Sequence, residues 1–598
     1  MIFLKRIITL ASVLLAFIYA RAASDMHIVG TMNNWTVSDE YKMTETVEGA
    51  EWTFDFGQAE LAGQHFMIKQ SAVIGVYLGA CNTVGTLDDG LITLQPNGYD
   101  IMLSPKYKSA TNVKVILKKN SLIYSSTLTV TGNFTKDESY EAPTPASATE
   151  PSGTLPVLYL TTDSSKSVID KPLTHDVATA GTCYIDSKGI DGQENLGDKD
   201  NQYAVTVQGR GNLTWKGFAK KPYKLKFNSS TSPLGLSAGK KFALMAGADD
   251  IYSQLRNVVG YEISRRMNMP WTPAQCPVEV VWNGEYLGLY MISETIGIGK
   301  NRVNITQQAD NETEAHAITG GWLVEIDNFE TTPQVVLPDA GNWWPLRITG
   351  SSPEVWSAEQ EAYVKDQWQH IYDAVSTSDW EATAKYIDID AAARFYIIQE
   401  ITENREAYNG SCNLYKDIDP EGGTSKWMFG PVWDFGCTMS SLNNGKPQYI
   451  WEDYAFNAHI IDNLHNDPDF MESVKRQWRS FMENNYDGLT TVIHNTITAT
   501  AQAAKNDAAR WPQYDHSDVA SAEAAYVTRL QERIEWLTQQ WGGPSGIENI
   551  EREETNDTHS QAANNNSAYY TLQGIRVSKP HNGTLYIHNG KKLVWQRD

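Results

Sequence analysis

Two acidic side chains, Glu406 and Asp434, stand at the ends of expected regular elements and could act together on a phosphate. Glu406 closes a polar run, 403–406, that follows helix-favouring residues at 391–399, and Asp434 ends an expected strand at 427–433. Mg²⁺ prefers oxygen ligands, keeps several waters and is usually held by one or two carboxylates plus substrate phosphates. A carboxylate near the metal can also orient an attacking hydroxyl. The residue types therefore predict a site for a divalent metal and a phosphate.

One helix and one hairpin must position these two acids. Asp388 or Asp390 can cap the start of the helix, and a turn at Asn409-Gly410 leads into a strand at 412–415. A loop with Pro420 and two glycines then leads to the strand that delivers the second acid. The Asp-Phe-Gly triplet alone is a weak signal, because an acid at a strand end is more often solvated or capping than catalytic.

Six separated segments extend this pattern over about residues 155–545. In chain order they are RGNLTW at 210–215, KKPYKLK at 220–226, LRN at 255–257, NGEYLGLY at 283–290, GGWLVEID at 320–327 and FGPVWDF at 429–435. On these segments the chain resembles the CotH (spore-coat protein H) family of atypical protein kinases. The resemblance implies an α+β, two-lobed kinase-like domain that uses ATP with Mg²⁺ or Mn²⁺ and phosphorylates Ser or Thr of a protein substrate.

The resemblance also assigns roles to the two acids. It makes Asp434 a metal ligand, and it places Glu406, with a share in the metal site, where the family's catalytic Asp usually stands. Two departures affect activity. The family usually has Asn-x-Asp where this chain has Asn404-Arg405-Glu406, and it often has a further Asp where this chain has Gly436. Since a Glu moves the charge by about one methylene, and a misplacement of about 1 Å can cost about a hundredfold in rate, an inactive relative stays an alternative.

Basic residues of the same segments are the phosphate-binding candidates. Arg210 lies between two glycines after an expected strand at 203–208, although a plain β-turn also fits. By family logic a strand lysine contacts the α- and β-phosphates; Lys224 is favoured, with Lys221 and Lys226 as alternatives. Arg256, at the head of an expected helix, could bind a phosphate with its fork of donors or brace an acid.

Further elements surround these candidates. Asn283-Gly284 between strands at 277–282 and 286–294 predicts a hairpin with a type I′ turn. In the strand at 321–326 and just after it, Glu325 and Asp327 share one face; they could join the acidic site or pair with Arg or Lys. From residue 357 on, 3.6-residue periodicity predicts helices at 359–375, 469–482, 491–509 and 518–541.

Bulk properties bound the rest of the chain. With 598 residues, it is expected to form two to four domains. A net charge of −23 disfavours nucleic acid, whose phosphates require a basic surface. The five cysteines form no zinc pattern. Cys412 and Cys437 flank the central hairpin and could pair, but isolated buried thiols are preferred.

The start of the chain reads as an export signal. Residues 1–22 combine Lys5 and Arg6, an apolar run at 7–19 and a small-x-small site at Ala20-Arg21-Ala22. We therefore expect an exported protein that is periplasmic, secreted or on the cell surface, with no membrane span after signal cleavage.

Residues 25–133 are expected to form an all-β sandwich, because alternating runs recur between turn signals. The start of this region, VGTMNNW at 29–35, resembles the first strand and turn of starch-binding modules, which implies an α-glucan or another glycan as a ligand. Trp35, in the turn, could stack on a sugar or belong to the core; for Trp52, in an alternating strand, the core is favoured.

Two polar linkers complete the organisation. They are residues 134–154 and 546–568, which lack any hydrophobic periodicity. The end, residues 569–598, alternates like a short β segment and resembles sorting modules of Bacteroides-type Gram-negative bacteria. The expected protein is thus multidomain, with a sandwich at 25–133, a kinase-like domain at 155–545 and a C-terminal β segment. The alternative function is an inactive kinase-like scaffold that binds glycans or has a structural role at the cell surface.

Overall fold

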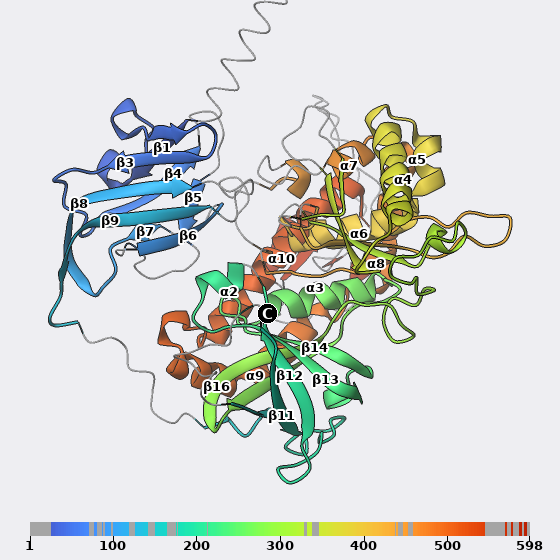
Figure 1. Ribbon diagram of the computed structural model, residues 1–598, viewed down its shortest axis with the longest axis horizontal. Coiled ribbons are helices and arrows are strands. Elements are labelled where there is room, and N and C mark those ends of the chain that lie inside the picture. Colours follow the sequence, from blue (N-terminus) through green and yellow to red (C-terminus); the bar gives the residue numbers. More distant parts are fainter. Residues whose placement is uncertain are drawn as a thin grey trace, which may run out of the picture. The chain divides into compact units, whose positions relative to one another are not determined.

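The computed structural model describes most of the chain between residue 25 and residue 543, together with four short strands near the end (Figure 1). The described residues are 25–70, 77–80, 87, 90–96, 100–118, 126–140, 150–163, 175, 177–211, 213–327, 332–337, 346–408, 410–436, 438–439, 447–452, 459–543, 569–570, 576–577, 585–588 and 591–594. The chain forms two compact units, Met1–Leu537 and Thr538–Asp598. None of the helices in the described ranges is both long enough and apolar enough to cross a membrane.

The N-terminal region is built from β-strands, as expected. Its nine-stranded sheet has the order β1-β4-β5-β6-β9-β8-β3-β2, with β7 paired to β4. Ile28 on β1 and Trp52 on β3 lie towards opposite ends of this order, yet they share one hydrophobic core. The elements are β1 (Met26–Gly30), η1 (Thr31–Asn33), η2 (Asp39–Tyr41), β2 (Thr44–Val47), β3 (Glu51–Asp55), β4 (His65–Gln70), β5 (Tyr77–Ala80), β6 (Gly90–Pro96), β7 (Ile101–Met102), β8 (Tyr107–Lys118) and β9 (Thr127–Lys136).

The two tryptophans of this region differ. Trp52 is only 2% exposed, which confirms that it is a core residue. Trp35 is 37% exposed and has a left-handed backbone, with φ of 58°, in the turn after β1. Trp35 is therefore a surface residue and not part of the core.

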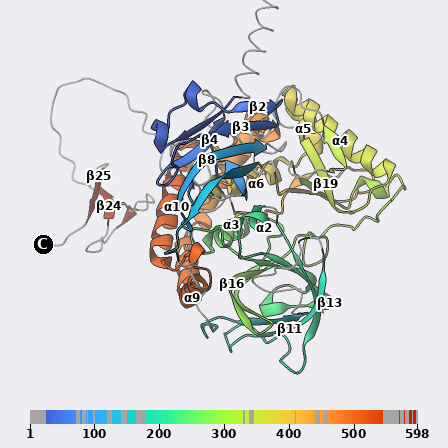
Figure 2. The same ribbon diagram turned by 60° about the vertical axis from the view of Figure 1, so that its left-hand side comes forward.

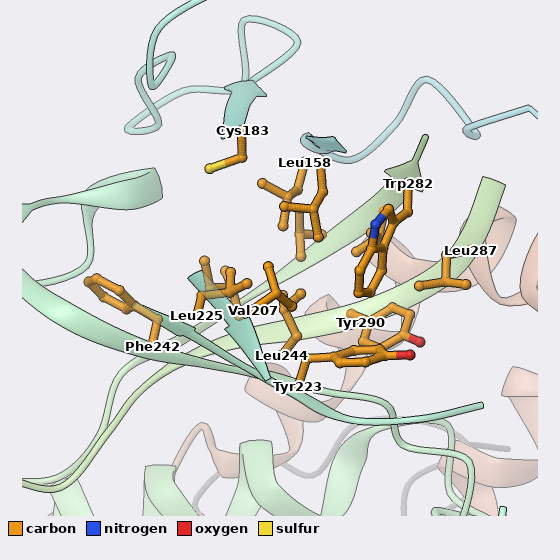
Figure 3. Close-up of a cluster of buried hydrophobic side chains, with 14 of the residues drawn as sticks. Leu158, Cys183, Val207, Tyr223, Leu225, Phe242, Leu244, Trp282, Leu287 and Tyr290 are labelled. Carbon is orange, nitrogen blue, oxygen red and sulfur yellow. The ribbon is translucent and has the colours of Figure 1, made fainter. Parts of the chain in front are cut away.

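A closed seven-stranded barrel follows. Its order is β10-β11-β12-β13-β14-β16-β15, and a parallel pairing of β10 with β15 closes it. Alternate residues of each strand fill the interior, and Figure 3 shows side chains such as Leu158, Val207 and Trp282 pointing toward one another. The elements are β10 (Val157–Thr162), β11 (Thr179–Asp186), β12 (Tyr203–Gly209), α2 (Leu213–Gly217), β13 (Tyr223–Thr231), η4 (Pro233–Gly235), β14 (Gly239–Met245), α3 (Leu255–Arg266), β15 (Gln275–Trp282) and β16 (Glu285–Glu294).

The predicted hairpin at 277–294 is confirmed as β15 and β16. Asn283 and Gly284 have φ of 51° and 84°, the two left-handed residues that a type I′ turn requires. Helix α3 lies between the barrel and the later helices in both ribbon views (Figures 1 and 2).

The second half combines a five-stranded sheet, of order β18-β19-β17-β20-β21, with the predicted helices. Figure 2 shows α9 beside β16, and the two elements are in contact. The elements are η5 (Ala317–Thr319), β17 (Trp322–Ile326), β18 (Val335–Leu337), β19 (Leu346–Ser352), α4 (Ala358–Ser376), α5 (Trp380–Tyr386), α6 (Ile389–Thr402), β20 (Cys412–Lys416), β21 (Met428–Phe429), η7 (Ile450–Glu452), α7 (His459–Leu464), α8 (Pro468–Asn484), α9 (Leu489–Arg510), η9 (Pro512–Tyr514) and α10 (Val519–Trp541).

The helix and hairpin that carry the two predicted acids are present, with one correction. Asp388 caps α6 by accepting a hydrogen bond from the Ala391 N–H at 2.8 Å. The strand expected at 427–433 is only Met428–Phe429, because Pro431 has no N–H to donate to a neighbouring strand. Residues 430–434 instead form no strand and lie outside the sheet.

The C-terminal unit contains a four-stranded sheet of order β23-β22-β24-β25. Its strands are β22 (Tyr569–Tyr570), β23 (Arg576–Val577), β24 (Leu585–His588) and β25 (Lys591–Val594). Residues 1–22, residues 141–149 of the first expected linker, the second expected linker at 546–568, Cys81 and Cys437 lie outside the described residues. The first linker begins later than residue 134, because β9 continues to Lys136. Cys183, Cys276 and Cys412 are free thiols.

Candidate functional site

Asp434 has a backbone that is fixed from two directions. Its φ of 55° is left-handed, which costs a residue other than glycine about 1–3 kcal/mol and persists only where the surroundings enforce it. The Asn404 side-chain amide donates to the Asp434 carbonyl at 3.1 Å, and the next N–H, of Phe435, donates to the Asn257 side-chain oxygen at 3.1 Å. Asn257 belongs to α3 and Asn404 to the turn after α6. Both elements therefore hold Asp434 in place.

Phe435 anchors the same segment in the core. Its ring is 0% exposed and meets the Tyr261 ring edge-on, with the centroids 5.6 Å apart. Gly260, on α3, lies directly against the ring, because a Cβ at this position would stand 2.5 to 2.6 Å from three of the ring carbons. The absence of a side chain at 260 thus lets α3 approach the segment that carries Asp434.

Glu406 belongs to the turn that follows α6. The helix ends at Thr402, and its C-cap, Glu403, is left-handed with φ of 51° and forms a partly buried ion pair with Arg529 at 2.8 Å. The Glu406 N–H donates to the Asn404 side-chain oxygen at 3.3 Å, and the amide of Asn404 contacts the Asp434 carbonyl. One side chain therefore joins the backbones of the two predicted acids.

Two further acids, Asp249 and Glu325, lie near Asp434. Burial raises the pKa of Asp249 to about 6; Arg256 opposes the shift, while Asp250 and Asp434 add to it. Burial, with the nearby charges of Asp327 and Asp434, raises the pKa of Glu325 to about 8. The expectation that Glu325 could join the acidic site thus has electrostatic support.

Gly436 separates two of these carboxylates. A Cβ on Gly436 would lie 3.2 Å from Asp249 Oδ2 and 3.2 Å from Asp434 Oδ1. Both oxygens therefore border the space that a side chain at 436 would fill. Two hard oxygen donors beside such a space suit Mg²⁺ or Mn²⁺, which also needs room for water and phosphate oxygens. In the described ranges, no group of three or more His, Cys, Asp or Glu side chains forms a metal site on its own.

The two predicted arginines make different contacts. Arg210 lies 5.6 Å from the Trp433 ring centroid and in electrostatic range of Asp434; burial lowers its pKa, and Asp434 opposes the shift. Arg256 is buried, and its Nη1 donates to the Asp249 carbonyl at 3.0 Å and the Gly436 carbonyl at 2.8 Å. Arg210, whose Nη1 donates to the Met245 sulfur at 2.7 Å, thus lies within electrostatic range of Asp434, whereas Arg256 braces the two segments that carry the acids.

Comparison with known families decides the ancestry. The family described as CotH kinase protein matches residues 207–540. The chain belongs to the CotH kinase family. No curated protein matches it. The resemblance expected from the sequence is therefore confirmed, and the matched range contains every acid and base of the site described above.

In this CotH kinase family member the favoured lysine, Lys224, lies on the outer face of the barrel. Its neighbours Tyr223 and Leu225 point inward, and its own side chain is exposed. Partial burial lowers its pKa, as do the nearby Arg210 and Lys241 charges. Lys224 therefore lies close enough to Arg210 for the two positive charges to repel each other.

Lys226 is exposed on β13 like Lys224, whereas two other lysines of the motif are engaged elsewhere. Lys221 donates to the Trp215 carbonyl and lies 5.4 Å from that ring centroid. Lys220 is 1% exposed, 2.7 Å from Asp507 Oδ1 on α9 and 2.6 Å from the Leu289 carbonyl oxygen. Lys220 thus connects the barrel to α9.

Sequence reasoning missed Asp249 and the structural role of Lys220. The Asp249-Asp250 pair is visible in the sequence, but only the loop conformation shows which carboxylate faces Asp434. Likewise, the run of lysines at 220–226 does not show where β13 begins, and the strand start at Tyr223 decides which of them point outward.

Proposed function

We propose that this chain is a metal-dependent phosphotransferase that moves the γ-phosphate of ATP to a Ser or Thr hydroxyl of a protein. Membership in the CotH kinase family supports a kinase-like protein in general. The observation that carries the proposal is Asp434, held in a left-handed conformation between Asn257 and Asn404 and beside Arg210. Such a costly backbone suits a group whose position matters to chemistry.

Roles follow from this placement. Asp434 would hold Mg²⁺ or Mn²⁺, which supplies neutralisation of phosphate charge when bound. Arg210 would offer its fork of donors to a phosphate bound beside Asp434. Lys224 would add a positive charge from the outer face of the barrel. Glu406 would accept the proton of the acceptor hydroxyl, from a backbone joined to Asp434 through Asn404. Transfer of this kind depends mainly on positioning and charge neutralisation.

Export is part of the same proposal. It rests on the charged start, apolar run and small-x-small site of residues 1–22. An exported kinase would act on proteins of the periplasm or the cell surface.

The test compares the chain without residues 1–22, its Asp434→Asn variant and an Asp366→Asn control. Asp366 is exposed on α4 with its side chain 65% accessible, so its loss removes one solvent-exposed carboxylate. We would measure thermal stability with ATP and Mn²⁺ or Mg²⁺, and label transfer from γ-labelled ATP to casein and to the chain itself. A ligand at a hundred times its Kd adds about 2.7 kcal/mol of stability.

Metal-dependent stabilisation and label transfer that persist in Asp366→Asn and disappear in Asp434→Asn would support the proposal. The absence of both stabilisation and transfer in the unsubstituted chain would refute it. Equal activity in Asp434→Asn would also refute it, because the central acid would then have no role.

A further inference from the structure

Two adjacent aspartates, Asp249 and Asp250, precede α3 and have different surroundings. The Asp250 carboxylate is buried and accepts the Tyr252 N–H at 2.9 Å and the Arg256 N–H at 3.0 Å. It therefore satisfies an N–H in the first turn of α3, whose N-cap residue is Gln254, and this is a structural task. Since its oxygens are used in this way, Asp250 is not available to a ligand at the site.

Asp249 has no comparable partner. Within the described part of the chain, no side chain donates a hydrogen bond to its carboxylate. The nearest bases act elsewhere: Arg256 gives its Nη1 to two backbone carbonyls, and Lys220 gives its Nζ to Asp507 and the Leu289 carbonyl. Asp249 is half-buried, and a cation bound beside its carboxylate would favour the ionised form over the neutral one.

The loop around Asp249 is nevertheless held firmly. The Arg256 guanidinium joins the Asp249 carbonyl to the Gly436 carbonyl. His516 and the Ala248 carbonyl are within hydrogen-bond distance at 3.2 Å, and the Ser253 hydroxyl donates to the His516 carbonyl at 2.7 Å. The backbone at Asp249 is therefore held by contacts that do not involve its carboxylate.

The carboxylate points to Asp434 across Gly436. Asp249 Oδ2 and Asp434 Oδ1 each lie 3.2 Å from the place where a Cβ on Gly436 would stand. Residue 436 has no side chain to stand between these oxygens, and its N–H donates to Asp434 Oδ1 at 3.2 Å, which leaves the further lone pairs of the carboxylate for a ligand. Two carboxylate oxygens converging there match the one or two carboxylates that hold Mg²⁺ in phosphate-transferring sites.

We infer that Asp249 supplies the second metal-holding carboxylate of the site, opposite Asp434 and across Gly436. The inference rests on the proposed phosphotransferase function and adds a residue to it. Asp250, by contrast, only accepts N–H groups at the start of α3. The aspartate pair thus divides into one residue that binds the metal and one that fixes the helix beside it.

The experiment measures Mn²⁺ binding to the chain without residues 1–22 by electron paramagnetic resonance, in the presence of a non-hydrolysable ATP analogue. Five proteins are compared: the unsubstituted chain, Asp434→Asn, Asp249→Asn, Asp250→Asn and the double variant Asp249→Asn with Gly436→Asp. Thermal unfolding of each protein without metal reports separately on the structural cost. Neither readout requires phosphate transfer.

Asp249→Asn is expected to weaken Mn²⁺ binding at least tenfold, since even groups behind the ligands change metal affinity by 10–100-fold. Asp250→Asn is expected to lower the melting temperature and leave the Kd for Mn²⁺ within about threefold. The double variant is expected to recover binding, because a carboxylate grown from residue 436 starts beside the same two oxygens.

Two results would overturn the inference while leaving the proposed function intact. One is Mn²⁺ binding by Asp249→Asn that equals that of the unsubstituted chain while Asp434→Asn has lost it. The other is equal loss in Asp249→Asn and Asp250→Asn, which would indicate a structural cause. Failure of the unsubstituted chain to bind Mn²⁺ would refute the proposed function itself, and the inference with it.

Discussion

Replacing Gly260 by alanine should disturb the site more than the fold. An added methyl would stand 2.5 Å from Phe435 ring carbons, whereas carbon atoms normally keep 3.5–4.0 Å apart, so the ring must retreat by about 1 Å. Alanine improves helix propensity by about 1 kcal/mol, and overpacking typically costs about 1–3 kcal/mol. The net loss of stability should therefore be at most about 2 kcal/mol. Asp434, the preceding residue, should move with the ring.

The consequence for chemistry is larger, since a 1 Å misplacement can cost about a hundredfold in rate. Urea unfolding would measure the stability, and Mn²⁺ affinity with label transfer would measure the site. Gly297→Ala is the control, because a Cβ there would meet no atom within 4 Å. If Gly260→Ala gained the full 1 kcal/mol and kept its metal affinity, the close packing of α3 on Phe435 would be wrong as an explanation of how Asp434 is positioned.

Two other predictions concern buried charges away from the metal. Lys220→Met should cost about 3–5 kcal/mol, because Asp507 would lose its cation while it stays buried, and adding Asp507→Asn should recover part of that loss. Denaturant unfolding of the single and double variants tests this, and strictly additive losses would contradict it. Burial lowers the pKa of His27 in the folded chain. As the pH falls below about 6.5, the unfolded chain therefore binds a proton more readily than the folded chain, and β1 should lose stability. Hydrogen exchange of β1 amides should show this loss in the full chain but not in His27→Phe, and the same pH dependence in both proteins would rule it out.

Much of the fold follows from local patterns in the sequence. The helices after residue 357 and the β15–β16 hairpin are present near their predicted bounds because 3.6-residue periodicity and Asn283-Gly284 are local signals. The expected strand at 427–433 was too long, since one proline ended the pairing. The β-rich N-terminal region also agrees with the alternation of its strands.

The site is predictable only in part, because its contacts join distant segments. Asp434 and Glu406 could be selected from motifs, and Asn404, between them, turned out to link their backbones. The convergence of Asp249 on Gly436 has no local signature, since the two residues meet only after α3 packs on Phe435. Long-range packing of this kind cannot be read from spacing along one chain.

The parallel pairing that closes the barrel bears on how the protein folds. β10 pairs with β11 and with β15, so Val157 has to find Glu279 across most of the barrel's own sequence. Such non-local pairing slows folding, because loop-closure entropy is spent before the contact forms. Until β15 has been synthesised, β10 keeps an open edge that could recruit strands of other chains. Pairing of β15 covers the edge of β10, but β14 and β15 keep open edges until β16 pairs with both of them. Completion of β16 is therefore the step that closes the barrel and removes the last edge open to self-association.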